Sequence, residues 1–316
     1  MEDGRLVEKP LDIRRLDAFV KVVDLGSVTR AAGVLRLAQP ALSQQFAGLE
    51  QDFGTKLLVR SPRGVTPTEA GMVLYRYAST IHRQLEEARR NIKNVSGQLS
   101  GNVTVGLAPW SSASLLGPAL LREVRRQHPG LLIHVCDIFG MAFSELVLRG
   151  KVDLALLYGD KPPRGLHYKP LYAEEFCLLA APEVAPDGPG PIDAQALSQL
   201  PLILPTEESF LRQMVDRQCR NAGLVSTIIA EVQSREVLAA ALADGLGATV
   251  LPIGVAQAMA ADGRLVIRPI TPAMSMPVSI CIPDSTGLTD AAYAVHELLL
   301  GLVREAHPAP APQPAI

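Results

Sequence analysis

The feature that most limits the fold of this chain is a pair of short helical patterns, residues 27–35 and 40–53, separated by a short link. Ser27 can cap the first helix, and Pro40 begins the second where a missing backbone N–H costs nothing. Two short helices joined by a tight turn form a helix-turn-helix. On this pattern alone, an ordinary pair of surface helices fits as well. The apolar positions of the two faces are Val28, Ala31, Ala32 and Leu35, then Leu42, Phe46, Leu49 and Phe53.

The residues after this pair favour a DNA-binding interpretation. Residues 57–60 predict a short strand, 61–64 a turn and 65–67 a return strand. Such a hairpin carries Arg60 and Arg63 at its tip, where a wing reaches phosphate or the minor groove. The second helix of the pair presents hydroxyl and amide side chains that suit base edges in the major groove. We therefore predict an all-α winged helix-turn-helix over residues 11–70.

A long helical pattern follows the hairpin. Thr66 or Thr68 can cap a helix over residues 69–95, and Glu69 lies near the positive end of its dipole. Apolar residues fall close to one stripe along it. Because this length exceeds that of an ordinary globular helix, we expect residues 71–96 to be a dimerising linker. A dimer supplies two recognition helices for a dyad-symmetric site.

The distribution of charge is consistent with DNA binding at one end of the chain. The formal net charge of −2 argues weakly against a nucleic-acid partner. Residues 1–95, however, hold 15 Lys and Arg against 11 Asp and Glu, whereas the remainder holds 15 against 21. A basic head on an acidic body fits a protein that meets DNA with its N-terminal part only.

From residue 101 onward, strand and helix patterns alternate. Strands are predicted at 102–107, 131–138 and 154–158, with helices at 115–126 and 143–149 between them. A further set has strands near 176–181, 201–204, 227–232, 249–251 and 279–282 and a final helix at 290–303. Strand–helix–strand units predict an α/β domain over 101–303. The Pro- and Ala-rich end predicts a disordered tail over 304–316.

Residues 31–71 carry one continuous motif, A-A-x-x-L-x-x-A-Q-P-A-L-S-Q-Q-x-x-x-L-E-x-x-x-G-x-x-L-L-x-R-x-x-R-G-V-x-P-T-E-A-G. This motif strongly resembles the DNA-binding region of LysR-type transcriptional regulators, and the resemblance extends over nearly the whole chain. The combinations AQPALSQQ, RGVTPTEAG, VGLAP and GATVLP are most similar to the branch that controls nitrogen assimilation. The resemblance implies a cytoplasmic homo-oligomer, dimer or tetramer, that acts on dyad-symmetric promoter sites, with RNA polymerase as a further partner. Another metabolic pathway, with a small carboxylate or aromatic co-inducer, stays open as the alternative.

The resemblance also implies which residues meet DNA. Base contacts fall to Gln39, Pro40, Ala41, Ser43 and Gln44, and wing contacts to Arg60 and Arg63. Many members of the family have Arg where this chain has Gln44. Because Gln reads adenine with two hydrogen bonds whereas Arg favours guanine, we expect a different base preference at that position.

The resemblance further implies that the α/β domain is like a periplasmic binding protein, with an effector cleft between two subdomains. The first subdomain would span about 101–173 plus 269–303, and the second about 174–268. Ligand would bind where strand ends meet helix N-termini. Candidate effector-binding residues are Trp110, Ser111, Ser112, Phe139, Met141, Thr206, Ser234 and Arg235, with Arg235 as the basic partner for a carboxylate.

Structural roles compete with ligand binding at several of these positions. Ser111 and Ser112 fit simple helix capping at least as well. Trp110, Phe139 and Met141 fit packing in a core or interface, and their bulk is consistent with a cleft that is already filled.

Other classes of protein fit the sequence poorly. An enzyme is disfavoured because G-x-S-x-G, P-loop and H-E-x-x-H motifs are absent and the six histidines do not cluster with acids. The four cysteines are widely spaced, which predicts reduced thiols, and we expect no metal and no cofactor. A transport-type solute-binding protein would need a secretory signal, and no apolar run is long enough to cross a membrane.

Overall fold

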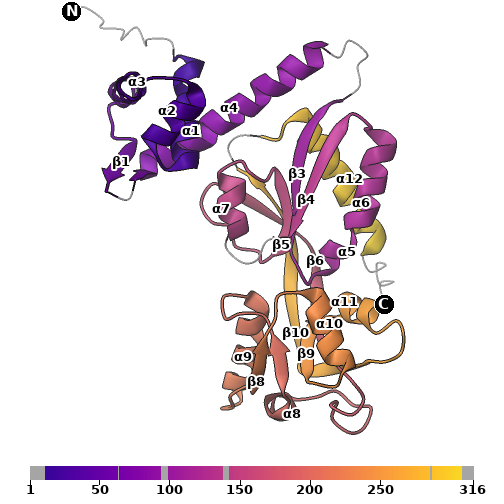
Figure 1. The fold of residues 1–316 in the computed structure, drawn as a ribbon. Helices are drawn as coiled ribbons and strands as arrows, with labels where there is room; N and C mark the ends of the chain where they lie inside the picture. Colours follow the sequence, from indigo (N-terminus) through magenta and orange to yellow (C-terminus); the bar gives the residue numbers. More distant parts are fainter. Residues whose placement is uncertain (1–10, 63, 94–98, 138–141, 285–286, 308–316) are drawn as a thin grey trace, which may run out of the picture. The chain divides into compact units, whose positions relative to one another are not determined.

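The computed structural model describes residues 11–62, 64–93, 99–137, 142–284 and 287–307. The chain divides into two compact units, residues 1–101 with 148–151, and the remaining residues up to 316 (Figure 1). Within the described ranges, no helix combines the length and the apolar character that crossing a bilayer requires.

The first unit is a winged helix-turn-helix followed by a long helix (Figure 1). Its elements are α1 (Ile13–Leu25), α2 (Val28–Leu35), α3 (Gln39–Asp52), β1 (Leu58–Ser61), β2 (Gly64–Pro67) and α4 (Glu69–Lys93). Ser27 caps α2 as predicted, since its hydroxyl accepts a hydrogen bond from the Arg30 backbone N–H at 3.3 Å. Of the two candidates for capping the long helix, Thr68 is the one that does so, through the Gly71 N–H at 2.9 Å.

The core of this unit lies among α1, α2, α3 and the start of α4. Most of the two predicted apolar faces points into it, with Leu42 and Leu49 fully buried. Phe53 does not, because α3 ends at Asp52 and the Phe53 side chain is 47% exposed. The Phe19 ring of α1 meets the Phe46 ring of α3 edge to face, with 6.5 Å between the ring centroids. Tyr75 of α4 is buried in the same core, and its hydroxyl donates to the Asp24 carboxylate at 2.5 Å. Farther along α4, Ile92 is 77% exposed.

The second unit is built on one eight-stranded sheet with the order β4-β3-β5-β10-β6-β9-β7-β8. The first lobe holds β3 (Gly101–Leu107), α5 (Ser112–Leu115), α6 (Gly117–Gln127), β4 (Leu131–Asp137), α7 (Ala142–Leu148), β5 (Leu154–Tyr158) and α12 (Asp290–Ala306). The second lobe holds α8 (Ala194–Gln199), β7 (Leu202–Leu204), α9 (Phe210–Asn221), β8 (Ile228–Glu231), α10 (Arg235–Ala243), β9 (Ala248–Pro252) and α11 (Ile253–Met259). Figure 1 shows the two lobes joined by long strands.

Those long strands are β6 (Leu166–Ala180) and β10 (Val266–Pro283), which pair with each other in antiparallel fashion. Val278–Cys281 of β10 also pair with β5 of the first lobe. Phe176–Ala180 of β6 pair with β9 of the second lobe. The subdomain boundaries expected at 173/174 and 268/269 therefore lie inside continuous strands. Only the parts 176–181 and 279–282 were predicted as strand, so both predictions were too short.

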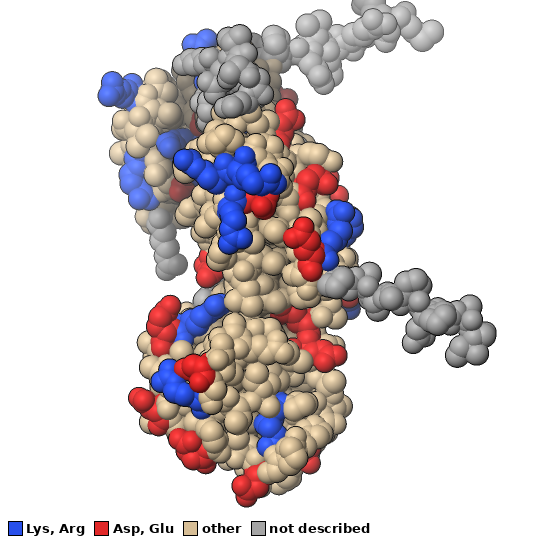
Figure 2. All heavy atoms as spheres, turned by 90° about the vertical axis from the view of Figure 1, so that its right-hand side faces the viewer, with Lys and Arg blue, Asp and Glu red and all other residues tan. Residues whose placement is uncertain are grey.

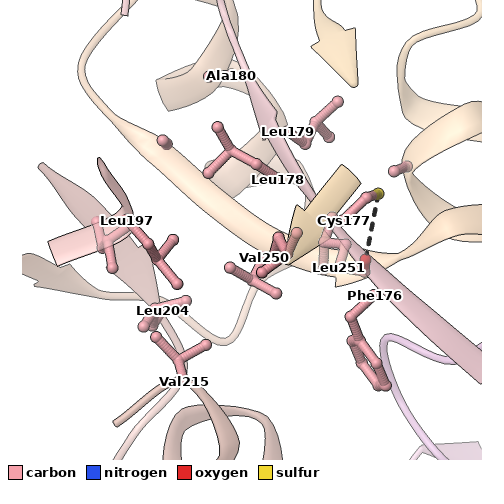
Figure 3. Packing of buried hydrophobic residues seen from close by; sticks show 14 of the residues in the cluster. Phe176, Cys177, Leu178, Leu179, Ala180, Leu197, Leu204, Val215, Val250 and Leu251 are labelled. Carbon is pink, nitrogen blue, oxygen red and sulfur yellow. Dashed lines mark hydrogen bonds between the residues drawn. The ribbon is translucent and has the colours of Figure 1, made fainter. Parts of the chain in front are cut away.

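The second lobe has a dense apolar core. Leu178, Leu197, Val215 and Val250 are all fully buried there, and Figure 3 shows how their side chains converge. The Cys177 thiol donates to the Leu251 carbonyl at 3.4 Å. Trp110, which follows β3 of the first lobe, packs into this same cluster.

Two other details differ from the sequence predictions. The helix expected at 115–126 is divided into α5 and α6 at Leu116, next to Gly117 and Pro118. The final helix extends to Ala306, so residues 304–306 of the expected tail are helical because α12 continues its apolar face through Val303. Residues 308–316 lie outside the described part of the chain.

Gly71 provides a test of the first unit. A Cβ added at Gly71 would lie 2.0 Å from the Leu57 carbonyl oxygen, so backbone must shift to accept any side chain. We expect Gly71→Ala to destabilise the unit by about 1–3 kcal/mol, measured by urea unfolding. Gly33→Ala is the matched control, because no atom beyond the adjoining backbone of α2 lies within 4 Å of its added Cβ and Ala is the better helix former. Equal stability of the two variants would contradict the assigned close approach.

Candidate DNA interface and effector cleft

The second helix of the helix-turn-helix, α3, exposes the residues predicted to read DNA. It begins at Gln39, with Pro40 in its first turn, and its N-cap Ala38 supplies no side-chain hydrogen bond. Gln39, Pro40, Ala41 and Gln44 are exposed, and Ser43 is half-buried. Because Leu42, Phe46 and Leu49 anchor the opposite face in the core, the polar face is presented outward on a fixed helix.

Thr29 of α2 also belongs to this surface, although sequence reasoning did not single it out. Its hydroxyl donates to the Gln39 side-chain oxygen at 3.4 Å. This contact leaves the two N–H donors of the Gln39 amide available for other partners. Thr29 occupies an exposed position on α2 in the sequence, but only the crossing of α2 and α3 reveals the contact.

The wing is an antiparallel hairpin of β1 and β2, with Ser61 opposite Gly64 at its tip. Arg60 is exposed on β1, whereas Arg63 lies outside the described residues. The Val65 backbone N–H donates to the Gly26 carbonyl at 2.9 Å, which ties the return strand to the turn between α1 and α2. A Cβ at Gly64 would lie 2.5 Å from that same carbonyl, and its φ of 129° also favours glycine. The base of the wing is therefore tightly packed.

In the second unit, a cleft of about 570 Å³ lies between the lobes. The first lobe supplies the ends of β3 and β4 and the helices α5 and α6, and the second lobe supplies the start of α10. The residues that line it are Leu107, Pro109, Trp110, Ser114, Gly117, Val135, Asp137, Gln233, Ser234, Arg235 and Glu236. Its charged groups are thus two carboxylates and one guanidinium.

Three of the predicted effector residues, Trp110, Ser234 and Arg235, line this cleft. Ser111 and Ser112 do not line it, and neither caps a helix with its side chain. The buried Ser111 hydroxyl instead donates to the Ala108 carbonyl at 2.6 Å. Phe139 and Met141 lie outside the described residues.

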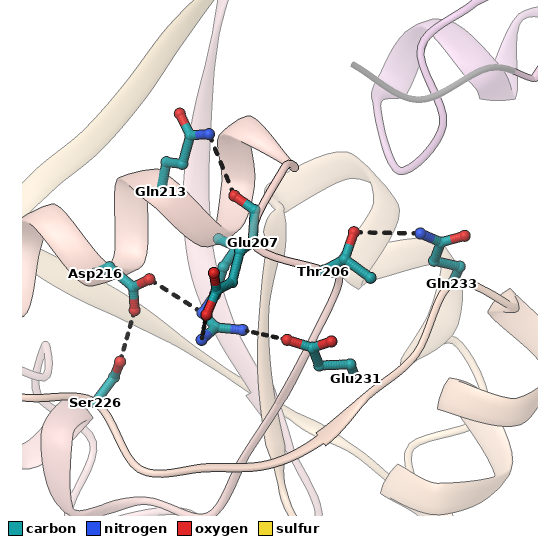
Figure 4. Close-up of polar contacts among 8 residues, drawn as sticks. Thr206, Glu207, Gln213, Asp216, Ser226, Glu231 and Gln233 are labelled. Atoms are coloured by element: carbon teal, nitrogen blue, oxygen red, sulfur yellow. Dashed lines mark hydrogen bonds and ion pairs between the residues drawn. The ribbon is translucent and has the colours of Figure 1, made fainter. Parts of the chain in front are cut away.

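Thr206 is also absent from the residues that line the cleft. Its hydroxyl accepts a hydrogen bond from the Gln233 amide at 3.3 Å (Figure 4). The Arg212 guanidinium lies between the carboxylates of Asp216, at 3.1 Å, and Glu231, at 3.0 Å. The polar groups around Thr206 are therefore used to hold α9 and β8 together.

The polar groups of Ser112 are hydrogen-bonded within a part-buried network. Its backbone N–H donates to the Glu174 carboxylate at 2.6 Å, and its hydroxyl contacts both Glu174 and the Tyr172 hydroxyl. Tyr158 also donates to Glu174. Burial, together with the nearby Glu174 charge, raises the pKa of both tyrosines above their usual value, so both remain protonated donors.

Arg235 spans the cleft from one lobe to the other. Its guanidinium donates to the Ser114 hydroxyl at 2.9 Å and lies 5.8 Å from the centroid of the Trp110 ring. Trp110 itself has a φ of 61°, a left-handed conformation that is uncommon for a side chain of this size. Asp137, Gln233, Glu236 and Ser114 were not predicted to line the cleft, although Gln233 and Glu236 flank the predicted pair Ser234 and Arg235 in sequence.

The cysteines do not form a reactive pair. All four are free thiols, and three of them are buried. Burial raises the pKa of Cys177 and Cys281 to about 12, which keeps them protonated and poorly nucleophilic near neutral pH. Among the described residues, no group of His, Cys, Asp and Glu is arranged to hold a metal ion.

The first unit combines a winged helix-turn-helix with a long helix, and the second is a two-lobed α/β unit with a cleft. This combination is typical of a DNA-binding transcriptional regulator with an effector-binding domain. The model of the bacterial regulatory helix-turn-helix protein, lysR family, matches residues 13–72. The model of the LysR substrate binding domain matches residues 96–304. The chain belongs to the LysR family of transcriptional regulators, as the sequence motif indicated.

The relatives are similar along most of the chain. The chain is 42% identical to the nitrogen assimilation regulatory protein nac of Klebsiella aerogenes, over 93% of this chain and 95% of that protein. It is 39% identical to the protein of the same name from Escherichia coli K12, with the same coverage. The crystal structure of ArgP from Mycobacterium tuberculosis has the same fold, with a TM-score of 0.75, 22% identity and coverage of 93% and 98%.

The Arg235 contact can be tested with the chain's only tryptophan, Trp110, which is 6% exposed. Because Arg235 covers this ring, we expect Arg235→Ala to shift the tryptophan emission to longer wavelength and to increase its quenching by acrylamide. Arg264→Ala is the control, since Arg264 is largely exposed and pairs with nearby Asp262 at 2.6 Å. An unchanged spectrum in Arg235→Ala would show that the guanidinium does not cover the ring.

Proposed function

We propose that this protein controls the transcription of nitrogen-assimilation genes by binding dyad-symmetric promoter sites as a homo-oligomer in the cytoplasm. The proposal rests on sequence identity to two nitrogen assimilation regulatory proteins. The chain is 42% identical to one and 39% identical to the other, in both cases over 93% of its length. A bound oligomer would act by altering DNA bend and contact with RNA polymerase. Mapping the DNA bound in cells, with and without nitrogen limitation, tests this. Sites with no link to nitrogen genes would count against it.

A second candidate function is control of another pathway in response to a small carboxylate. The open cleft of about 570 Å³, with Arg235 at its wall, favours this alternative. A metabolite that quenched Trp110 fluorescence at low concentration and changed promoter binding would favour it over effector-independent control.

In this proposal, α3 reads bases and the wing meets phosphate. The support is the exposed face made by Gln39, Pro40, Ala41, Ser43 and Gln44, together with exposed Arg60. Arg63 belongs to the proposed wing contact by its place in the sequence. Figure 2 shows acidic and basic side chains interspersed on the lower part of the visible face of the α/β unit, with one group of adjoining basic side chains on its upper part.

Gln44 allows a sharp test of base reading. We expect Gln44→Ala to lower affinity for cognate DNA by about 1–3 kcal/mol while sparing affinity for random DNA, because one bidentate base contact is lost. Gln51→Ala is the control, being an exposed Gln near the other end of α3. Fluorescence anisotropy with both DNAs measures the effect. Equal losses on cognate and random DNA would rule out a base contact by Gln44.

Self-association is supported by apolar side chains at both edges of the α/β sheet. Leu132 on edge strand β4 is 66% exposed. At the other edge, Ile229 on β8 is 51% exposed, and Val225, just before β8, is 84% exposed. Near the first edge, α6 exposes Arg122 and Arg125, whereas the second lobe exposes Glu207 and Glu231. These opposite charges would allow the β4 edge of one copy to pack against the β8 edge of a second copy. Exposed Ile92 on α4 supports a further contact through the linker helix.

We therefore expect Leu132→Asp and Val225→Asp each to reduce the oligomer mass, because a buried carboxylate without a partner opposes association. Light scattering coupled to size exclusion measures the mass. Leu246→Asp is the control, since Leu246 is 60% exposed but lies after α10, away from both edge strands in the chain. A mass unchanged in both edge variants would exclude the sheet edges as the interface.

A further inference from the structure

Glu50, in the last part of α3, connects the recognition helix to the wing. One of its carboxylate oxygens, Oε1, accepts hydrogen bonds from the backbone N–H groups of Leu57 at 3.0 Å and Leu58 at 3.3 Å. The other, Oε2, meets the Lys56 ammonium at 2.7 Å. The Glu50 side chain is 15% exposed, whereas that of Lys56 is 82% exposed. A recognition-helix side chain therefore binds the backbone where β1 begins.

The same short segment is bound from the other side by the start of α4. The Thr68 hydroxyl donates to the Lys56 carbonyl at 2.7 Å, and the Thr68 backbone N–H donates to the Leu57 carbonyl at 3.0 Å. The N–H groups of Leu57 and Leu58 are thus held by α3, and the carbonyls of Lys56 and Leu57 are held by the cap of α4. The position of the wing depends on both attachments.

The chemistry of Glu50 suits an anchor for backbone N–H groups. Burial by itself would raise the pKa of Glu50, but the hydrogen bonds from Lys56, Leu57 and Leu58 outweigh it and hold the pKa below its usual value. Hydrogen bonds to an ionised acceptor are stronger than those between neutral groups. The Lys56 ammonium is solvent-exposed, so solvent screens its attraction to Glu50, whereas the two backbone N–H bonds are part-buried.

We propose that Glu50 is a positioning residue for DNA binding, which fixes the wing relative to α3 so that Arg60 meets the DNA backbone while α3 meets the bases. This inference rests on the proposed DNA contacts of α3 and the wing. Glu50 itself does not touch DNA in this scheme; it acts through Arg60.

The test is a double-mutant cycle in the full-length chain, with dissociation constants on cognate DNA. In the native background, Arg60→Ala should weaken binding by about tenfold or more, the effect of losing a charged hydrogen bond. In the Glu50→Ala background, the same substitution should weaken binding by less than about threefold, because the wing no longer holds Arg60 in place. A purely structural role for Glu50 would leave the two effects equal.

Two further variants separate anchoring from charge and from general stability. Glu50→Gln keeps an acceptor oxygen for both N–H groups but loses the pair with Lys56, so the Arg60 effect should return to about tenfold. Asp52→Ala removes a nearby carboxylate on the same helix, one that pairs instead with Arg15 of α1 at 3.0 Å. The Arg60 effect should keep its full size in that background.

Amide hydrogen exchange of residues 57–67 provides a readout without DNA. Exchange should accelerate in Glu50→Ala, but not in Glu50→Gln or Asp52→Ala. Unchanged exchange, or an undiminished Arg60 effect in Glu50→Ala, would overturn the role of Glu50. If Arg60→Ala had no effect in the native chain, the proposed wing contact itself would be wrong, and exchange alone would then decide whether Glu50 anchors the hairpin.

Discussion

The antiparallel pairing of β6 with β10 is the constraint on which the α/β unit depends. These strands pair over nearly their whole lengths, and each also continues the sheet of one lobe, β10 through β5 and β6 through β9. Because a strand within a sheet is fixed by hydrogen bonds on both sides, the lobes share one backbone framework. The cleft lies where the two lobes are not joined by this framework. Its walls are the ends of β3 and β4 in the first lobe and the start of α10 in the second.

In the winged unit, a similar dependence connects the core to the proposed DNA-binding surface. Three apolar side chains of α3 and the Phe19 ring of α1 fix the rotation of α3 about its axis. That rotation decides which residues face outward, so burial of Leu42 and Leu49 also determines the exposure of Gln44. Glu50 then extends the same constraint from α3 to the wing.

Much of this could be predicted from the sequence where the determining interactions are local. The cap at Ser27, the apolar faces of α2 and α3 and the hairpin of the wing all lie within neighbouring residues of the chain. The long strands could not be predicted in full, since β10 contains several prolines and β6 contains Glu174 and Glu175, residue types that are rare in strands. Their pairing with each other overrides those preferences. The lining of the cleft was predicted only in part. Asp137 and Glu236 are far apart in the sequence, and only the tertiary fold places both on its wall.

Arg235 joins the two walls of the cleft through two contacts that are individually weak. Its hydrogen bond to Ser114 and its contact with Trp110 each contribute about 0.5–1.5 kcal/mol in comparable settings. Together they amount to about 1–3 kcal/mol, or roughly a 5- to 150-fold bias toward the arrangement in which the lobes are joined at this point. A carboxylate that bound Arg235 would first have to replace these two contacts. Its net binding free energy would then depend on its interactions with Asp137, Gln233 and Glu236. Because two of those three are carboxylates, a simple anion is opposed by the rest of the lining, and a ligand that also carries a cationic group fits the cleft better. Under the alternative function proposed above, the wall of the cleft would therefore discriminate by charge distribution, and a ligand carrying both charges would be the one to replace the partners of Arg235.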